Sequence, residues 1–243
     1  MLLQLEETDS TNNYLKQLLS KQEIEECSVV IAEKQTFSFA SFMVFFSWES
    51  EPGKILTFSI ILYPHHIPAS RQFALSQIIS LGIIDILQKF GPGFSIKWPN
   101  DIYWNEKKLV GILIENELTG HTFNTAIVGI GINVNQELFL STAPNPISLK
   151  QITGKDIDRY TLLSDILNAI MKRYYHYEEN NDKTLNDSYM KFLFRNNGTY
   201  FFKTENELFK ASIKGIENDG HLILETENGE ERKYAFKEVS YVL

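Results

Sequence analysis

The chain of 243 residues has little cysteine, no excess of positive charge and no long uninterrupted apolar run. Cys27 is the single cysteine, which excludes an internal disulfide and is typical of a reducing compartment. Lysine and arginine number 23 against 31 aspartates and glutamates, so the formal net charge is −8. Neutralising the phosphates of duplex DNA needs clustered cations, and this balance therefore argues against a DNA-binding protein.

Signals for a membrane or for secretion are also missing from the sequence. No stretch approaches the roughly 18 consecutive apolar residues that a membrane-spanning helix needs. Residues 1–7 lack the basic segment and the apolar core of a signal peptide. We therefore expect a cytoplasmic protein without a membrane partner. With 43% hydrophobic residues, the chain still has enough apolar side chains for an ordinary core.

Two common site motifs are absent as well. The five histidines are His65, His66, His121, His176 and His221. They show neither the HExxH nor the zinc-finger spacing, so no zinc site is expected. Residues 129–133, Gly-Ile-Gly-Ile-Asn, lack the third glycine and the following helix of a dinucleotide-binding fingerprint. We expect these glycines to let a strand backbone approach a ligand or a packed neighbour, with a structural β-bulge as the alternative.

The most informative feature present is the run of residues 97–101, Lys-Trp-Pro-Asn-Asp, followed by Lys108. Pro99 fixes its own φ and biases Trp98 away from helix, so the neighbouring side chains are held at fixed angles that suit a binding site. A positioned ammonium such as that of Lys108 offsets repulsion when a carboxylate is joined to a phosphate. Lys107 and Lys108 point to opposite faces of an extended chain, so only one can enter a site. For Lys107 and Lys108 the alternative is a solvated hairpin edge. For residues 97–101 it is a structural turn in which Asp or Asn caps backbone amides.

Apolar periodicity predicts an α+β fold with a mixed, mainly antiparallel sheet packed with helices. Short links at 105–106 and 119–120 predict antiparallel hairpins. The expected helices cover residues 12–19, 68–90 and 159–177, with one more ending at 194, and the expected strands cover 28–32, 55–62, 102–104, 109–116 and 122–132. After residue 199, short strands separated by Asn-Asp-Gly and Asn-Gly indicate a small β module. We therefore expect two domains, 1–194 and 195–243.

Together with Ser10-Thr11-Asn12 near the start, these segments resemble the biotin protein ligase family in order and spacing over most of the chain. The resemblance implies a class II synthetase-like, biotin/lipoate ligase fold followed by a small SH3-like β-barrel. It implies an ATP-dependent enzyme that activates biotin as biotinyl-5'-AMP and transfers it to a lysine of a biotin carboxyl carrier domain. ATP and Mg²⁺ are the implied cofactors, and biotin is the implied substrate.

The same resemblance assigns roles to individual residues, with Lys108 as the catalytic lysine directed at the biotin carboxylate and the α-phosphate. The residues that would bind biotin are Ser10, Thr11, Asn12, Gln35, Trp48, Lys108 and Gly111. Those that would bind ATP are Lys97, Trp98, Asn100, Asp101, Gly131 and Asn133. Asp101 would also hold Mg²⁺, a cation that prefers carboxylate oxygens. From residue chemistry alone, residues 10–12 are equally explained as a helix cap.

The sequence departs from the family pattern at residues 37–46. The family has a glycine- and arginine-rich loop that closes over biotin and its adenylate, whereas this chain reads Phe-Ser-Phe-Ala-Ser-Phe-Met-Val-Phe-Phe. Glycines expose backbone N–H groups to phosphate and arginines add charge, so we expect a weakened hold on the adenylate. Because both flanks match the family, the difference resembles a local reading-frame disturbance.

Two other functions remain open at this stage. A lipoate or octanoyl ligase-type acyltransferase would share the fold and a key lysine. A catalytically impaired biotin-binding protein would follow from the replaced loop. The sequence starts almost directly at the expected catalytic domain, so no DNA-binding helix-turn-helix is expected, and the resemblance suggests a homodimer paired through sheet edges.

Overall fold

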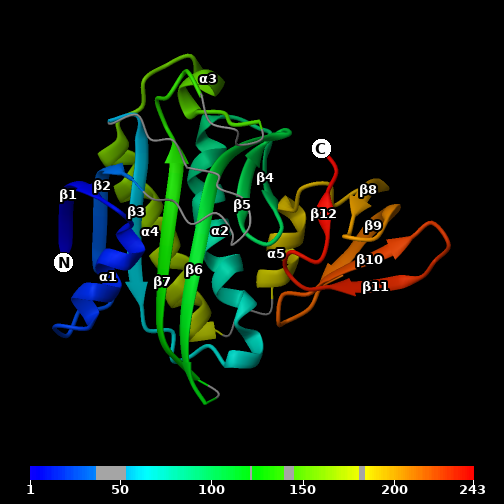
Figure 1. Ribbon diagram of the computed structural model, residues 1–243, viewed down its shortest axis with the longest axis horizontal. Helices are drawn as coiled ribbons and strands as arrows, with labels where there is room; N and C mark the ends of the chain where they lie inside the picture. Colours follow the sequence, from blue (N-terminus) through cyan, green and yellow to red (C-terminus); the bar gives the residue numbers. More distant parts are fainter. Residues whose placement is uncertain (37–52, 121, 140–144, 181–183) are drawn as a thin grey trace.

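The computed structural model describes residues 1–36, 53–120, 122–139, 145–180 and 184–243 (Figure 1). Within these ranges, seven strands form one mixed sheet, and five strands nearer the C-terminus form a second, antiparallel sheet. Helices pack on the first sheet. The predicted α+β class is therefore confirmed.

The first sheet has the strand order β1-β2-β3-β7-β6-β5-β4. Its strands are β1 (Leu2–Thr8), β2 (Val29–Gln35), β3 (Ile55–Leu62), β4 (Phe94–Lys97), β5 (Asp101–Trp104), β6 (Lys107–Thr119) and β7 (Thr122–Asn133). Strands β1 and β2 are parallel, and the other neighbours are antiparallel. The pairings β5–β6 and β6–β7 confirm the prediction made from the short links. The strands β1 and β4 were not predicted from the sequence.

The two faces of this sheet differ in composition. Strand β7 turns Val128, Ile130 and Ile132 toward the main apolar core. Its alternate residues, Gly129 and Gly131, therefore lie on the opposite face, since neighbouring strand residues point to opposite sides. This second face carries the small and polar residues of the central strands, and it is called the glycine face below.

Helices cover the core face. They are α2 (Phe73–Leu87), α4 (Arg159–Asn180) and α5 (Leu185–Phe192). The short helices η1 (Ala69–Arg71), η2 (Gln88–Phe90) and α3 (Leu149–Thr153) lie in the connections. Figure 1 shows α2 and α4 side by side behind the sheet, and the two helices are in close contact. The segment Phe73–Phe90 is long and apolar enough to cross a membrane, but 72% of it is buried within the protein, as in a core helix.

Helix α1 (Thr11–Leu19) packs on the glycine face against β2, β3 and β7. Its first turn is capped by Ser10, whose side-chain oxygen accepts a hydrogen bond from the Asn13 backbone N–H at 3.4 Å. A small apolar cluster of Leu15, Val30, Ile61 and Ile127 holds the helix on the sheet. The residues that precede Leu15 are thereby placed over the middle of β7.

The C-terminal sheet has the order β11-β10-β9-β8-β12. Its strands are β8 (Tyr200–Lys203), β9 (Leu208–Ile216), β10 (Leu222–Thr226), β11 (Glu231–Tyr234) and β12 (Ser240–Tyr241). In the described part of the chain, no ladder joins the edge strands β11 and β12, so the predicted closure into an SH3-like barrel is not shown. Strand β12 was not predicted from the sequence, and the two-domain division at residue 194 stays a prediction.

Candidate active site

Lys108 reaches the glycine face because strand β6 contains an extra residue. Ile102 pairs with Val110, but the next residue, Tyr103, pairs with Lys108, which leaves Leu109 as a β-bulge. Ile102, Leu109 and Val110 are buried in the core. Directly paired residues point to the same side, so Lys108 shares the face of Tyr103 and not that of Val110. The bulge therefore selects which of the two adjacent lysines enters the site.

Lys108 meets a second lysine and a carboxylate there. Its Nζ atom lies 2.5 Å from Oδ2 of Asp101, and both side chains are about three-quarters buried. Asp101 pairs with Lys97 across the β4–β5 hairpin, and the Lys97 Nζ donates to the Tyr103 hydroxyl at 3.2 Å. Burial lowers the pKa of the Lys97 ammonium, and nearby Lys108 adds to the lowering while Asp101 opposes it. This cluster therefore holds two positive charges and one negative charge on the glycine face.

The segment 145–147 fixes the Lys108 backbone. The Lys108 N–H donates to the Asn145 carbonyl at 2.8 Å, and the Ile147 N–H donates to the Lys108 carbonyl at 3.0 Å. The buried amide of Asn133 then donates from Nδ2 to the Ile147 carbonyl at 3.1 Å. Asn133 therefore supports the Lys108 strand from the end of β7.

Glycines form the floor between this cluster and α1. Gly131 pairs with Gly111 on one side and with Thr57 on the other. Without side chains, the backbone of β6 and β7 is open to close approach by a ligand on this face. Gly129, two residues earlier, lies under Asn12, and a Cβ atom there would overlap the Asn12 amide. The β7 residues 129, 131 and 133 thus connect the two polar groups of the site.

The second polar group lies at the start of α1. Gln35 accepts a hydrogen bond from the Thr11 backbone N–H through Oε1 at 3.1 Å. The Ser59 Oγ lies 2.6 Å from the Thr11 hydroxyl and 2.5 Å from Oδ1 of Asn12. Asn12 in turn donates to Glu115 at 2.8 Å. The structure therefore brings Thr11, Asn12 and Gln35 together, beside the helix cap formed by Ser10.

Trp98 lies in a different environment from Lys97. Its indole is 5% exposed, donates from Nε1 to the Gly220 carbonyl at 2.9 Å and meets the ring of Phe236 edge-on. Asn100 lies in the turn that precedes β5. Trp48 and the replaced loop at 37–46 lie outside the described residues.

Three polar residues of the site were not found from the sequence. Tyr103 lies between the apolar residues Ile102 and Trp104 of β5, and Ser59 is one of two hydroxyl residues, with Thr57, in the otherwise apolar β3. Glu115 ends the run of residues 111–115 that follows Lys108, but the sequence assigned no role to it. A polar residue in a strand that is otherwise buried on both faces was the available signal for Ser59, since such a group needs a hydrogen-bond partner.

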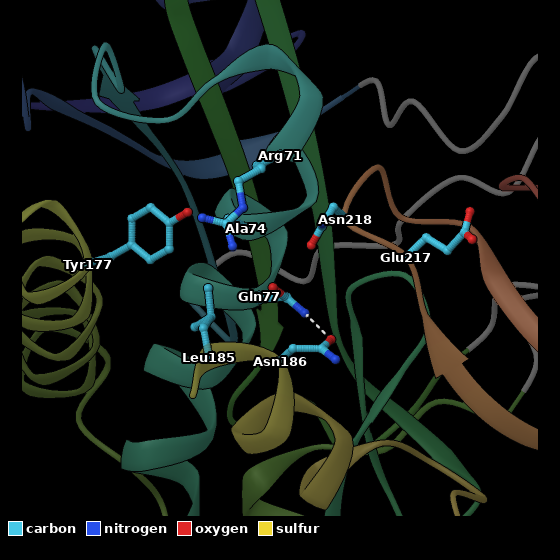
Figure 2. Close-up of a pocket in the computed structure, with 8 residues that line it drawn as sticks. All are labelled: Arg71, Ala74, Gln77, Tyr177, Leu185, Asn186, Glu217 and Asn218. Carbon is cyan, nitrogen blue, oxygen red and sulfur yellow. Dashed lines mark hydrogen bonds between the residues drawn. The ribbon is translucent and has the colours of Figure 1, made fainter. Parts of the chain in front are cut away.

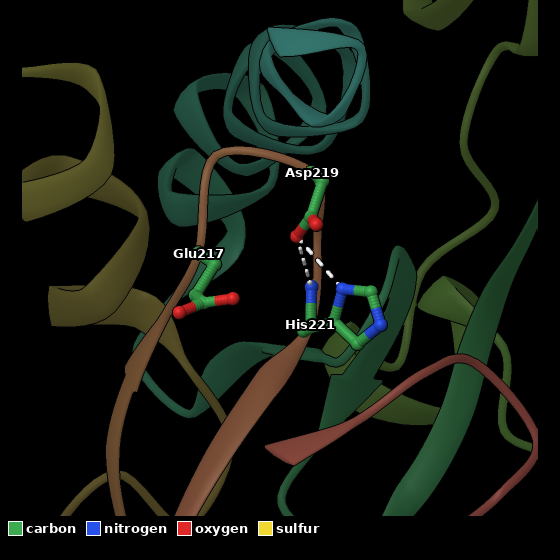
Figure 3. Close-up of side chains that lie close together, drawn as sticks. All are labelled: Glu217, Asp219 and His221. Carbon is green, nitrogen blue, oxygen red and sulfur yellow. Dashed lines mark hydrogen bonds and ion pairs between the residues drawn. The ribbon is translucent and has the colours of Figure 1, made fainter. Parts of the chain in front are cut away.

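Two further groupings lie away from Lys108. Figure 2 shows a small hollow between α2, α5 and the turn at 217–218, where Gln77 donates to Asn186 at 2.9 Å. Figure 3 shows Glu217, Asp219 and His221 close together in the turn that connects β9 and β10. Asp219 raises the pKa of His221 through a hydrogen bond, and Glu217 forms an ion pair with Lys233. The acidic side chains of this grouping thus each have a cationic or ionisable partner, and we describe it as a set of paired charges.

A second, open hollow borders α1 and is lined by Lys16, Glu115 and Thr125, among others. It adjoins the Asn12–Glu115 hydrogen bond. The structure thus has a buried polar group at the start of α1 that reaches the protein surface through Glu115.

Comparison with known proteins agrees with this geometry. Residues 5–133 match the model of the Biotin/lipoate A/B protein ligase family. The bifunctional ligase/repressor BirA of Bacillus subtilis (strain 168) is 33% identical over 226 residues, which cover 89% of this chain and 67% of the relative. BirA of Escherichia coli (strain K12) is 30% identical over 223 residues, with the same coverage. The biotin protein ligase of Aquifex aeolicus, solved in complex with biotin and ATP, superposes with a TM-score of 0.80 at 28% identity and covers 98% of this chain and 97% of its own.

The sheet with one glycine-lined polar face and the matches over nearly the whole chain define a ligase-type protein. The chain belongs to the Biotin/lipoate A/B protein ligase family.

Proposed function

We propose that the chain is a biotin protein ligase, which activates biotin with ATP and transfers it to a lysine of a biotin carboxyl carrier domain. The observation that carries the proposal is the pair of polar groups on one sheet face, with Lys108 at one end and Thr11 at the other. The relatives named above are ligases, and the Aquifex aeolicus enzyme was solved with biotin and ATP. The glycine floor between the groups suits a ligand with one polar and one anionic end.

In the first step, an oxygen of the biotin carboxylate attacks the α-phosphorus of ATP, and pyrophosphate leaves. Lys108 would lie between the two anions, and its charge would offset their repulsion as negative charge moves toward pyrophosphate. Lys97 would add a second positive charge on the same face. In the second step, the acceptor amine attacks the acyl carbon and AMP leaves, so this step needs mainly positioning.

The ATP side of the site would comprise Lys97, Asn100, Asp101, Gly131 and Asn133. A carboxylate is a donor that Mg²⁺ accepts, but one oxygen of Asp101 already contacts Lys108 at 2.5 Å. A metal ion would therefore take most of its other ligands from the triphosphate and water. Asn133 would act by holding the Lys108 strand, and Trp98 by fixing the turn, given the contacts of each.

We also propose the assignments that go with this function. Residues 1–194 would form the catalytic domain and residues 195–243 the C-terminal β domain. The protein would act in the cytoplasm, would not bind DNA and would form a homodimer. Gel filtration with light scattering at several concentrations tests the last point, and a monomer at all of them would contradict it.

Transfer of labelled biotin tests the function directly. The purified chain, Mg-ATP, labelled biotin and a biotin carboxyl carrier domain should give a labelled carrier. A reaction in which lipoate replaces biotin distinguishes a lipoate ligase, because only the matching acid should be transferred. A chain that binds lipoate and ignores biotin would overturn the proposal.

The replaced loop supports one second candidate, a biotin-binding protein with impaired catalysis. Residues 37–46 supply neither glycine nor arginine to the adenylate. Biotin-dependent exchange of labelled pyrophosphate into ATP measures adenylate formation alone. Biotin binding without exchange would favour this candidate, and exchange equal to that of a relative with an intact loop would remove it.

A further inference from the structure

The hydrogen bonds at the start of α1 have directions that chemistry alone assigns. The carboxylate of Glu115 only accepts hydrogen bonds, so the Asn12 atom that lies 2.8 Å from it must be the amide nitrogen. The Lys16 ammonium occupies the other carboxylate oxygen at 2.6 Å. The amide oxygen of Asn12 therefore faces Ser59, where the two oxygens are 2.5 Å apart.

The next two hydrogen bonds follow from the number of protons. An amide oxygen only accepts, so the single hydroxyl proton of Ser59 must point to Asn12. Ser59 Oγ also lies 2.6 Å from the Thr11 hydroxyl, a distance that requires a proton between the two oxygens. That proton has to come from Thr11. The alternative acceptor for it, Oε1 of Gln35, is farther away at 3.4 Å.

We propose that Glu115 and Ser59 are positioning residues that make Thr11 a hydrogen-bond acceptor for an N–H of the bound substrate. The inference rests on the proposed function, since the ureido ring of biotin carries two N–H groups. Thr11 directs its proton inward to Ser59 and keeps lone pairs for a ligand. Thr11, Asn12 and Ser59 are 3%, 3% and 0% exposed, so water does not readily rearrange their hydrogen bonds.

The variant Glu115→Gln tests the proposal because it should reverse the direction of each hydrogen bond between residue 115 and Thr11. The Lys16 ammonium can only donate, so the introduced amide would turn its oxygen to Lys16 and its NH2 group to Asn12. The Asn12 amide would then rotate, donate to Ser59, and make Ser59 donate to Thr11. Thr11 would direct its proton outward, toward a substrate N–H. We expect the Kd for biotin to rise about 10-fold or more, as for a lost and opposed hydrogen bond.

A second substitution separates this mechanism from simple damage to the fold. Adding Lys16→Met to Glu115→Gln removes the group that orients the introduced amide, which can then present its oxygen to Asn12 again. The double variant should bind biotin more tightly than Glu115→Gln alone. Glu117→Gln is the matched control, because Glu117 lies two residues along β6 and is exposed.

Two measurements decide the proposal. Calorimetry gives the biotin Kd of each variant, and nuclear Overhauser contacts from the Asn12 amide protons show, without ligand, whether they face residue 115 or Ser59. Reversal of the amide, weaker binding and rescue by Lys16→Met would support the proposal. An unreversed amide in Glu115→Gln, or weakened binding without rescue, would overturn it. Absence of biotin binding by the unaltered chain would instead overturn the proposed function. The contacts of the Asn12 amide protons would still show whether the hydrogen bonds have the proposed directions.

Discussion

Tyr103 and Lys108 are paired directly across strands β5 and β6, although Ile102 is paired with Val110. The extra residue between them turns Lys108 to the face where Asp101 lies. Lys107 remains exposed next to it. The two lysines share the same chemistry and nearly the same sequence position, so they form a natural pair for a test of catalytic placement.

Lys108→Ala should reduce the rate of biotinyl-adenylate formation by about 10²- to 10³-fold, because a positioned charge that stabilises a transition state has about this effect. Lys107→Ala should form the adenylate at a rate close to that of the unaltered chain. Pyrophosphate exchange at saturating biotin and ATP measures both. Equal rates for the two variants would show that the bulge does not select the reacting lysine.

Binding of ATP should be accompanied by proton uptake at alkaline pH. The pKa of Lys97 is lowered from 10.5 by burial, so as pH rises toward that lowered pKa a growing share of the side chain is neutral before binding. A bound triphosphate favours the charged form and raises the pKa, so the ammonium regains its proton. Calorimetry in two buffers of different ionisation enthalpy should show uptake that is larger at about pH 9 than at about pH 7.

Lys97→Arg provides the control for this proton uptake. The guanidinium keeps the positive charge at every pH used and cannot release a proton. The alkaline uptake should therefore disappear while ATP still binds. Uptake that persists in Lys97→Arg would assign the proton to another group.

Gly129→Ala should destabilise the protein by about 1–3 kcal/mol, as overpacking in a tight interior does. A Cβ atom at this position would overlap the Asn12 amide and displace α1 from the sheet. Biotin affinity should fall in the same variant. Gly215→Ala is the control, because a Cβ atom there meets no atom within 4 Å and the residue also lies in a strand. Urea unfolding measures the free energy of unfolding of each variant. An equal loss of stability in Gly129→Ala and Gly215→Ala would contradict the close contact at Gly129.

Trp98→Phe should cost about 1 kcal/mol of stability, since it removes the indole hydrogen bond to the Gly220 carbonyl and leaves that carbonyl without this donor. Trp104→Phe removes a similar bond, to the Pro92 carbonyl at 3.0 Å, but at an exposed site where water can replace it. Trp104→Phe should therefore lose less stability than Trp98→Phe. A smaller loss for Trp98→Phe than for Trp104→Phe, measured by thermal unfolding, would contradict this ordering.

The sequence predicted those elements whose signal is local. Strand β3 was predicted with the bounds that the structure has, because Ile55–Leu62 is a buried run of apolar and β-branched residues. The hairpins at 105–106 and 119–120 follow from their turns. Strand β1 was missed because Leu2–Thr8 is a mostly exposed edge strand, and its parallel pairing with β2 depends on a crossover through α1. Strand β4 follows a Gly-Pro-Gly turn, which conceals a strand of four residues.

The structure brings together residues that the family resemblance had grouped, and their roles in binding and catalysis stay predictions. Lys97, Asp101 and Lys108 are brought together, and so are Thr11, Asn12 and Gln35. The bulge at Leu109 leaves no composition signal, since it depends on how β6 meets its partner strand. Ser59 and Glu115 are also invisible to spacing arguments, because their partners are 47 and 103 residues away along the chain.

The turn at residues 97–99 has a consequence for how the protein can be divided. Lys97 lies over the rings of Tyr103 and Tyr241, while its neighbour Trp98 contacts Gly220 and Phe236. A fragment that ends before the C-terminal sheet would leave the Trp98 indole exposed to water. The Lys97 ammonium would lose its contact with the Tyr241 ring and would be more exposed to water. Removal of the small sheet would therefore change the surroundings of two residues proposed for the ATP side of the site, so we expect it to lower the affinity for nucleotide.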